Sequence, residues 1–171
     1  MGKDEKNLLT VKGIDGQQVL GNAFVAGGHV VSADHVVGEI CEIHFDNEAR
    51  VVEFVSRKSD GQDLSVSRYL VSTASLVRPC GFKVARRGLE VEEKGRIIGH
   101  HDFGRFEIQV KKIGRGIGPR TMVGVCEGQE LIREGMSGSA LLNSEGEVIG
   151  PVVSMINDGQ GGIIEHILKE K

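Results

Sequence analysis

Residues 135–150 read GMSGSALLNSEGEVIG, in which a serine between glycines precedes an apolar run, a turn and a second apolar run. Gly135 and Gly138, which flank the Met136-Ser137 pair, let the backbone turn sharply, so the hydroxyl projects and the adjacent N–H groups stay open. Two neighbouring N–H groups can then converge on one point, as a developing oxyanion requires. An ordinary glycine-serine hairpin loop shows the same local pattern, so this segment alone leaves both interpretations open.

A serine nucleophile needs an adjacent base and a third group that orients the base. Residues 21–37, GNAFVAGGHVVSADHVV, predict a strand, a glycine turn, a second strand and a tight turn that presents His35. Residues 59–66, SDGQDLSV, place Asp63 at the start of an alternating strand, whereas Asp60 in the Ser-Asp-Gly turn is the weaker third member. The other histidines are expected to be surface or structural residues: His29, His44, His100, His101 and His166.

Glycine punctuates short apolar segments along the whole chain. It accounts for 25 of the 171 residues, about twice average usage, with only three prolines. Short strands separated by turn signals every eight to twelve residues or so are typical of an all-β sandwich or barrel. In Arg105–Lys112 the apolar residues alternate with polar ones, which indicates a strand with one buried face.

The strand predictions fall into two groups. The first comprises Leu8–Lys12, Gln18–Ala26, His29–Ser32, Ile40–Phe45, Arg50–Val55 and Leu64–Leu70. The second comprises Gly81–Ala85, Gly95–His100, Phe106–Lys111, Met122–Cys126, Ser139–Leu142, Val148–Val153 and Gly162–Ile164. Ile163, Ile164, Ile167 and Leu168 are spaced for one face of a short C-terminal helix.

Composition excludes several classes of protein. The net charge of −3 is not that of a general polyanion binder, although residues 81–120 hold ten lysines and arginines against five acidic residues. No apolar run is long enough to cross a membrane, and the N-terminal residues lack a signal-peptide core. Three cysteines at unpatterned spacing (Cys41, Cys80 and Cys126) favour reduced thiols and a cytoplasmic protein.

The three segments in the order His, Asp, Ser resemble the signature regions of chymotrypsin-like serine proteases, especially compact viral polyprotein proteases and HtrA-type enzymes. The resemblance implies two six-stranded antiparallel β-barrels, over residues 1–76 and 80–171, with a short C-terminal helix. It implies that Ser137 is the nucleophile, His35 the base and Asp63 the orienting carboxylate. The N–H groups of Gly135 and Ser137 would form the oxyanion hole.

Two residues depart from the family pattern, since Ala140 stands where proline is usual and Asp34 precedes His35 where a small or neutral residue is commoner. No aspartate occupies the pocket-base region, which disfavours cleavage after lysine or arginine, and the preference expected is for acidic or medium-sized apolar residues. Substrate would add as a strand beside residues 152–155. The residues expected to contact substrate are Leu131, Ile132, Arg133, Val152, Val153 and Ser154.

The function predicted is that of a serine endopeptidase in the host cytoplasm, with its own viral polyprotein as the polypeptide substrate. A cellular HtrA-like protease is the alternative within that class, and a non-catalytic β-barrel module that binds RNA or peptide is the alternative outside it. Weak RNA binding would use basic residues within 83–120, including Lys83, Arg86, Arg87, Lys111, Lys112 and Arg115. No cofactor and no metal site are expected, because the cysteines form no C-x-x-C pair.

Overall fold

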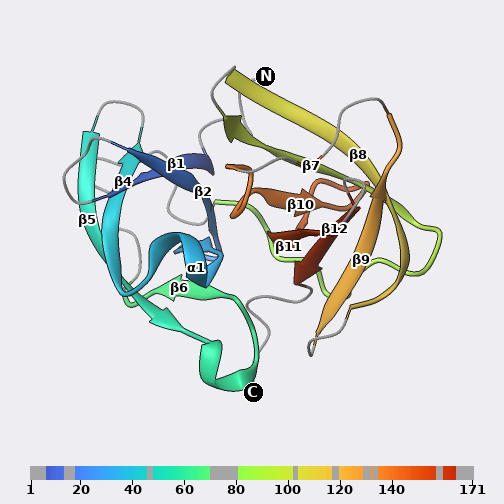
Figure 1. Ribbon diagram of the computed structural model, residues 1–171, viewed down its shortest axis with the longest axis horizontal. Helices are drawn as coiled ribbons and strands as arrows, with labels where there is room; N and C mark the ends of the chain where they lie inside the picture. Colours follow the sequence, from blue (N-terminus) through green and yellow to red (C-terminus); the bar gives the residue numbers. More distant parts are fainter. Residues whose placement is uncertain are drawn as a thin grey trace.

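The computed structural model describes residues 7–13, 18–45, 48–69, 81–101, 104–116, 120–128, 132, 135–156 and 160–164. Figure 1 shows two groups of strands side by side, the N-terminal group in blue to green and the C-terminal group in yellow to red. Strand pairing within each group is antiparallel throughout.

The first sheet closes on itself in the order β1-β2-β3-β6-β5-β4. One helical turn, α1 (Asp34–Val37), follows β3, and a 3₁₀ turn at Lys58–Asp60 precedes β6. The strands are β1 (Leu8–Lys12), β2 (Val19–Ala26), β3 (His29–Ser32), β4 (Ile40–Phe45), β5 (Glu48–Ser56) and β6 (Ser65–Ser67).

The second sheet closes in the order β10-β11-β12-β9-β8-β7, with β10 pairing β7 to complete the ring. Its strands are β7 (Lys94–His101), β8 (Gly104–Arg115), β9 (Thr121–Cys126), β10 (Ala140–Leu142), β11 (Val148–Ile156) and β12 (Gln160–Ile164).

The apolar faces of the strands build two cores. On β8, Phe106, Ile108 and Val110 are buried while Glu107 and Gln109 are exposed, which confirms the alternation read from the sequence. The core of the first sheet also takes in residues of the second, namely Ile98, Ala140, Leu142, Val148 and Val153. The two sheets therefore meet at a packed apolar junction, which fixes the segments that they carry there relative to one another.

The structure confirms the all-β prediction and corrects one strand. Residues 81–85 form single β-bridges, from Gly81 and Phe82 to Ala26 and from Val84 to Val148, instead of the predicted strand. This segment touches both sheets, so its backbone finds one partner at a time rather than a continuous ladder.

Two further predictions, the C-terminal helix and the boundary between the two halves, concern residues at or beyond the limits of the described ranges. Ile163 and Ile164 belong to β12, so the predicted C-terminal helix does not begin there, and residues 165–171 lie outside the described residues. The predicted boundary near residues 76–80 also lies outside them. In the part of the chain that is described, no helix has the length and apolar character to span a membrane.

Candidate active site

The first sheet joins His35 to Asp63 through two hydrogen bonds. His35 lies in α1, and its backbone N–H donates to Asp63 Oδ1 at 2.8 Å while its Nδ1 lies 2.5 Å from Asp63 Oδ2. Asp63 precedes β6, whose first residue pairs with Ser32 at the end of β3, just before α1. Strand pairing therefore brings together two residues that are 28 positions apart in the sequence.

The contact fixes which nitrogen of His35 can act as a base. An ionised carboxylate can only accept hydrogen bonds, so Nδ1 carries the proton that it donates to Asp63. In the neutral ring the lone pair is then on Nε2, the nitrogen that a general base uses. The imidazole is about half exposed, with 51% of its side-chain surface accessible, so a substrate can reach it.

Electrostatics reinforce this assignment. The hydrogen bond to Asp63 raises the pKa of His35 above 6.5, burial opposes that rise, and the charges of Asp63 and Asp34 add to it. Burial by itself would raise the pKa of Asp63, but the hydrogen bonds and charge of His35 outweigh it and hold that pKa below its usual value. Asp63 therefore stays ionised and stabilises a protonated imidazole beside it.

Ser137 belongs to the second sheet's loop before β10 and lies next to the turn that carries His35. Its carbonyl oxygen accepts a hydrogen bond from the backbone N–H of Asn22 on β2, at 2.9 Å. A Cβ added at Gly21 would lie 2.9 Å both from this oxygen and from Cγ1 of Val36, the neighbour of His35. Since both atoms are within 3 Å of one point, the Ser137 backbone and α1 are close neighbours.

The backbone of the Ser137 loop divides into N–H groups that are used and N–H groups that are open. Gly138 N–H donates to Val152 O at 2.7 Å, and Ser139 N–H donates to Met136 O at 3.1 Å. Within the described residues, the N–H groups of Gly135 and Ser137 meet no acceptor. These two are the groups that the sequence predicts for an oxyanion hole, and the observed bonding leaves both available.

Neither a family model nor a curated protein matches the sequence, but solved structures share the fold over nearly the whole chain. The inactive form of the Rv3671c protease, known from M. tuberculosis, covers 95% of this chain and 84% of its own at a TM-score of 0.72 and 14% identity. A human astrovirus serine protease matches at a TM-score of 0.70 and 15% identity, over 94% of this chain and 89% of its own. The MamO protease domain from Magnetospirillum magneticum matches at a TM-score of 0.71 and 13% identity, over 96% of this chain and 94% of its own.

The chain has the chymotrypsin-like protease fold. At these identities the likeness shows the fold, which both the sequence motifs and the strand topology indicate independently.

Two other aspartates named in the sequence analysis, Asp60 and Asp34, have structural positions outside the His35–Asp63 pair. Asp60 ends the 3₁₀ turn and its backbone N–H donates to Arg57 O, in keeping with its predicted place in a turn. The carboxylate of Asp34 accepts a hydrogen bond from the buried Ser65 hydroxyl at 2.7 Å, which anchors α1 to β6. Asp34 acts on His35 through its charge and not through a hydrogen bond among those described.

The described cysteines are not nucleophiles of this site. Burial raises the pKa of the Cys41 thiol to about 12 and raises that of Cys126, so both thiols are protonated at neutral pH. Among the described residues, no group of three or more histidine, cysteine, aspartate or glutamate side chains gathers as metal ligands do. Cys80 lies outside the described residues.

The residues expected to contact substrate divide by burial. Ile132 and Val152 are 3% and 1% exposed and pack in the second core, and Val153, at 8%, packs in the first. Ser154 is exposed, while Leu131 and Arg133 lie outside the described residues. The side chains of Ile132, Val152 and Val153 therefore belong to the cores. Contact between these residues and a substrate stays a prediction.

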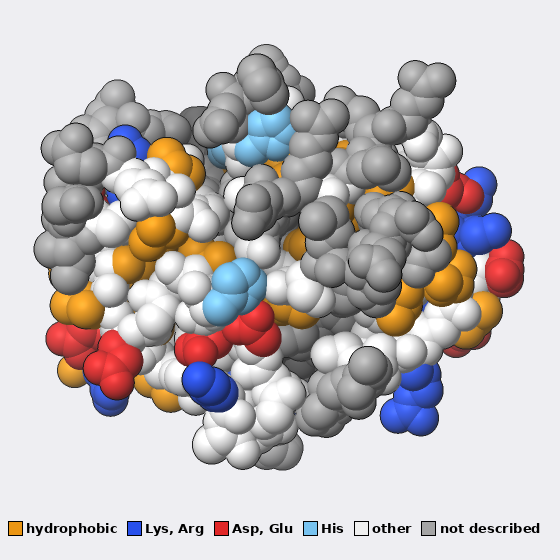
Figure 2. All heavy atoms as spheres, in the orientation of Figure 1, with side chains coloured by type: hydrophobic (Ala, Val, Ile, Leu, Met, Phe, Trp, Pro, Cys, Tyr) orange, Lys and Arg blue, Asp and Glu red, His pale blue; other side chains and the backbone are white. Residues whose placement is uncertain are grey.

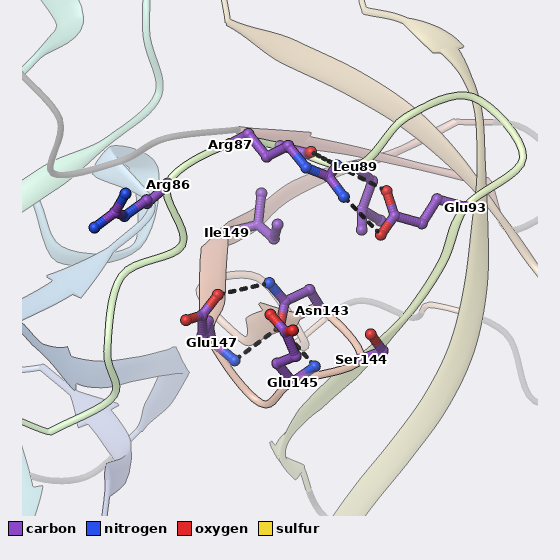
Figure 3. A pocket seen from close by; sticks show the side chains of 10 residues that line it. Arg86, Arg87, Leu89, Glu93, Asn143, Ser144, Glu145, Glu147 and Ile149 are labelled. Carbon is purple, nitrogen blue, oxygen red and sulfur yellow. Dashed lines mark hydrogen bonds and ion pairs between the residues drawn. The ribbon is translucent and has the colours of Figure 1, made fainter.

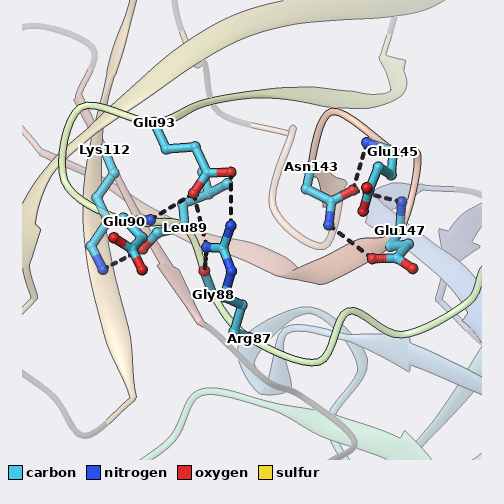
Figure 4. Close-up of polar contacts among 9 residues, drawn as sticks. All are labelled: Arg87, Gly88, Leu89, Glu90, Glu93, Lys112, Asn143, Glu145 and Glu147. Atoms are coloured by element: carbon cyan, nitrogen blue, oxygen red, sulfur yellow. Dashed lines mark hydrogen bonds and ion pairs between the residues drawn. The ribbon is translucent and has the colours of Figure 1, made fainter.

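A cavity of 420 Å³ lies elsewhere, between the segment that holds Arg87 and Glu93 and the turn that joins β10 to β11. Figure 3 shows Arg87 paired with Glu93 on one wall, and Asn143 and Glu147 on the other. Figure 4 shows that these polar side chains pair within their own wall, with Arg87 Nη1 2.9 Å from Glu93 Oε1 and Asn143 Nδ2 3.0 Å from Glu147 Oε1. None of the three candidate catalytic residues lines this cavity, so hydrolysis is not placed there.

Sequence reasoning missed Asn22, which lies at the junction of the two sheets beside the Ser137 loop. Its side-chain amide is 2% exposed and donates to the carbonyl oxygens of His100 and Gly135. Asparagine is depleted in strands, and this one interrupts the apolar run of residues 19–26. A buried polar residue in a strand is the signal that could have found it.

Proposed function

We propose that the chain is a serine endopeptidase in which Ser137, His35 and Asp63 form a catalytic triad. The hydrogen bond between His35 Nδ1 and Asp63 Oδ2, at 2.5 Å, is the observation that carries this proposal, because it leaves Nε2 as the basic nitrogen. The position of Ser137 beside α1 supports a proton transfer from its hydroxyl to that nitrogen. The fold of the solved proteases named above supports the same reaction class.

In this mechanism, Ser137 Oγ attacks the scissile carbonyl carbon while His35 Nε2 takes the hydroxyl proton. The oxyanion that forms accepts hydrogen bonds from the N–H groups of Gly135 and Ser137. His35 then gives its proton to the leaving amine, which departs and leaves an acyl-enzyme on Ser137. Water then attacks that ester while His35 takes its proton, and His35 returns the proton to Ser137 Oγ as the acid product leaves. Asp63 stabilises the imidazolium in both halves of the reaction.

The edge of β11 supports strand addition of the substrate. Beyond Val152, the described backbone of β11 pairs with β12 on one side and with no strand on the other. An extended peptide can therefore bind along residues 153–156 through main-chain hydrogen bonds, which would deliver its carbonyl to the Ser137 loop. Ser154, exposed on this strand, is the described residue best placed to contact it.

Labelling with a fluorophosphonate tests the proposal. The probe reacts with an activated serine, so we expect stoichiometric labelling of the native protein and localisation of the adduct to Ser137 by mass spectrometry. Ser137→Ala abolishes labelling and lowers peptide turnover by about 10⁴-fold or more. Ser144→Ala, at an exposed serine in the β10–β11 turn, leaves both unchanged. Folded native protein that takes up no label would overturn the proposal.

The finer proposal is that the enzyme processes a viral polyprotein. The likeness to the astrovirus protease supports it, while a serine endoprotease from Yersinia pestis, at a TM-score of 0.68 and 18% identity, supports the HtrA-like alternative. A polyprotein protease cuts a few defined junctions in its own precursor, whereas an HtrA-like enzyme degrades unfolded proteins at many sites. Mass spectrometry of the products from an unfolded bait protein separates the two outcomes.

RNA binding by residues 83–120 has less support from the structure. Several cations in this region face carboxylates: Lys83 faces Glu147, Arg87 faces Glu93, Lys111 faces Glu92, and Arg96 and Arg105 face Glu107. On the face shown in Figure 2, lysine and arginine side chains are scattered, with acidic side chains among them. Salt-dependent RNA binding without any peptide hydrolysis would favour this module over the protease.

A further inference from the structure

Asn22 is a buried polar residue whose side-chain hydrogen bonds all cross from one barrel to the other. Its Nδ2 donates to His100 O at 2.9 Å and to Gly135 O at 3.0 Å, and its Oδ1 accepts the backbone N–H of His100 at 2.8 Å. Burial of an amide is costly unless such bonds are made. The partners lie 78 and 113 residues away in the sequence, on β7 and in the Ser137 loop.

The backbone of the same residue also holds the loop. Asn22 N–H donates to Ser137 O at 2.9 Å, and Asn22 O accepts the Ser32 hydroxyl at 2.6 Å. Gly138 packs so closely on Asn22 that a Cβ there would collide with the Asn22 carbonyl oxygen. One residue of β2 therefore contacts the candidate nucleophile Ser137 and two glycines of its loop, Gly135 and Gly138.

Gly135 depends on this contact more than its neighbours do. Its φ of +93° is open to glycine, and a Cβ at this position would meet no atom within 4 Å, so packing does not fix the local backbone. Its carbonyl is instead oriented by the hydrogen bond from Asn22 Nδ2. This bond fixes the Gly135–Met136 peptide plane and so restricts ψ of Gly135, whose N–H, on the other side of the same Cα, is one half of the candidate oxyanion hole.

We propose that Asn22 is a positioning residue that holds the Gly135 backbone in the orientation required for oxyanion stabilisation. The inference rests on the proposed protease function, and it adds a residue outside the triad and the oxyanion hole. A neutral amide meets the requirement because it supplies two donors for two carbonyls and one acceptor for one N–H. A carboxylate of the same shape has no donor, so it would face both carbonyl oxygens with like partial charge.

The decisive variant is Asn22→Asp, with Ser67→Ala as its matched control. Ser67 is also a buried hydrogen-bonding side chain of the first barrel, accepting Val30 N–H and donating to Tyr69 O, without contact to the Ser137 loop. We expect Asn22→Asp to lower kcat by about 100-fold, the effect of impairing one oxyanion donor, and to change KM by less than about threefold. Ser67→Ala is expected to keep the native kcat and to lose about as much thermal stability as Asn22→Asp.

Amide hydrogen exchange gives a second readout that does not depend on turnover. We expect the N–H groups of Gly138 and Ser139 to exchange about tenfold faster or more in Asn22→Asp than in Ser67→Ala, because the loop opens more easily. Should Asn22→Asp fail to fold, Asn22→Ala carries the same comparison, since it also removes both side-chain donors.

The outcomes separate this inference from the proposed function. Native kcat together with native exchange in the Asn22 variant would overturn the role of Asn22. A kcat loss no larger than that of Ser67→Ala would overturn it as well. Native protein that neither reacts with a fluorophosphonate nor cleaves peptide would remove the protease function, and exchange at Gly138 and Ser139 would still decide whether Asn22 holds the loop.

Discussion

The two barrels build their parts of the candidate site by different means. The first joins two side chains, His35 and Asp63, through hydrogen bonds that start and end within that barrel. The second presents Ser137 on a loop whose shape depends on glycines and on hydrogen bonds to its carbonyl oxygens, two of which come from the backbone and the side chain of Asn22 in the first barrel. The acid–base pair is therefore complete within its own barrel, whereas the nucleophile loop needs its neighbour.

This difference separates two kinds of sensitivity to mutation. Substitution in the acid–base pair removes chemistry and leaves the strands that carry it in place, because both side chains are partly exposed. Substitution in the loop alters packing at the junction, because Gly138 touches Asn22 and Ser32 there. The predictions below test that separation, beginning with the largest effect.

Replacing the base should abolish turnover without unfolding the protein. We expect His35→Gln to lower kcat by about 10⁴-fold, since His35 is the general base of the proposed mechanism, with little change in thermal stability. The matched control is His44→Gln, which removes another histidine–carboxylate contact of the same barrel, the 2.8 Å contact of His44 with Glu42. Equal turnover in the two variants, measured by steady-state kinetics on a peptide substrate, would contradict the assignment of His35.

Adding one methyl group to the loop should affect folding rather than chemistry alone. Gly138→Ala combines a φ of +89° with a collision against the Asn22 carbonyl, so we expect a loss of about 3 kcal/mol in the free energy of unfolding.

Gly146→Ala is the control for that loss. Gly146 has a similar φ of +81° and open space around it, so its substitution should cost about 1 kcal/mol. Chemical denaturation measures both variants, and similar losses would show that the close approach to Asn22 does not constrain the loop.

The smallest predicted effect concerns the pH dependence of the base. His35 must be neutral to accept a proton, and its pKa is raised above 6.5, so kcat/KM should rise with pH through a midpoint above 6.5. The charge of Asp34 contributes to that rise, so Asp34→Asn should move the midpoint to lower pH by less than about one unit. The same raised pKa makes the ion pair's stabilising contribution fall as pH rises through the folded-state value.

Glu53→Gln is the control for the pH profile, because Glu53 faces Arg68 and is not among the charges that act on His35. A midpoint that stays fixed in Asp34→Asn, or that moves equally in both variants, would show that Asp34 does not tune the base.

Local sequence patterns correctly predicted strands that bury one apolar face, such as β8. The same kind of pattern wrongly predicted a strand at residues 81–85. That segment alternates like a strand, yet Gly81 and Phe82 bridge to Ala26 while Val84 bridges to Val148. Alternation reports which side chains can be buried and says nothing about whether a free strand edge is available beside the segment. The availability of that edge is decided by the placement of both sheets.

The amino-acid sequence is enough to identify the candidate nucleophile, base and carboxylate. A serine among glycines, a histidine in a tight turn and an aspartate before a strand each carry a local signature. Which of these groups meet, and what holds them, follows from strand pairing in the first barrel and from the packing of the two barrels against each other. The bond from His35 to Asp63 spans 28 residues, and the support that Asn22 gives to Gly135 spans 113. Contacts across such separations are selected by the packing of whole barrels, and no short window of sequence contains both partners.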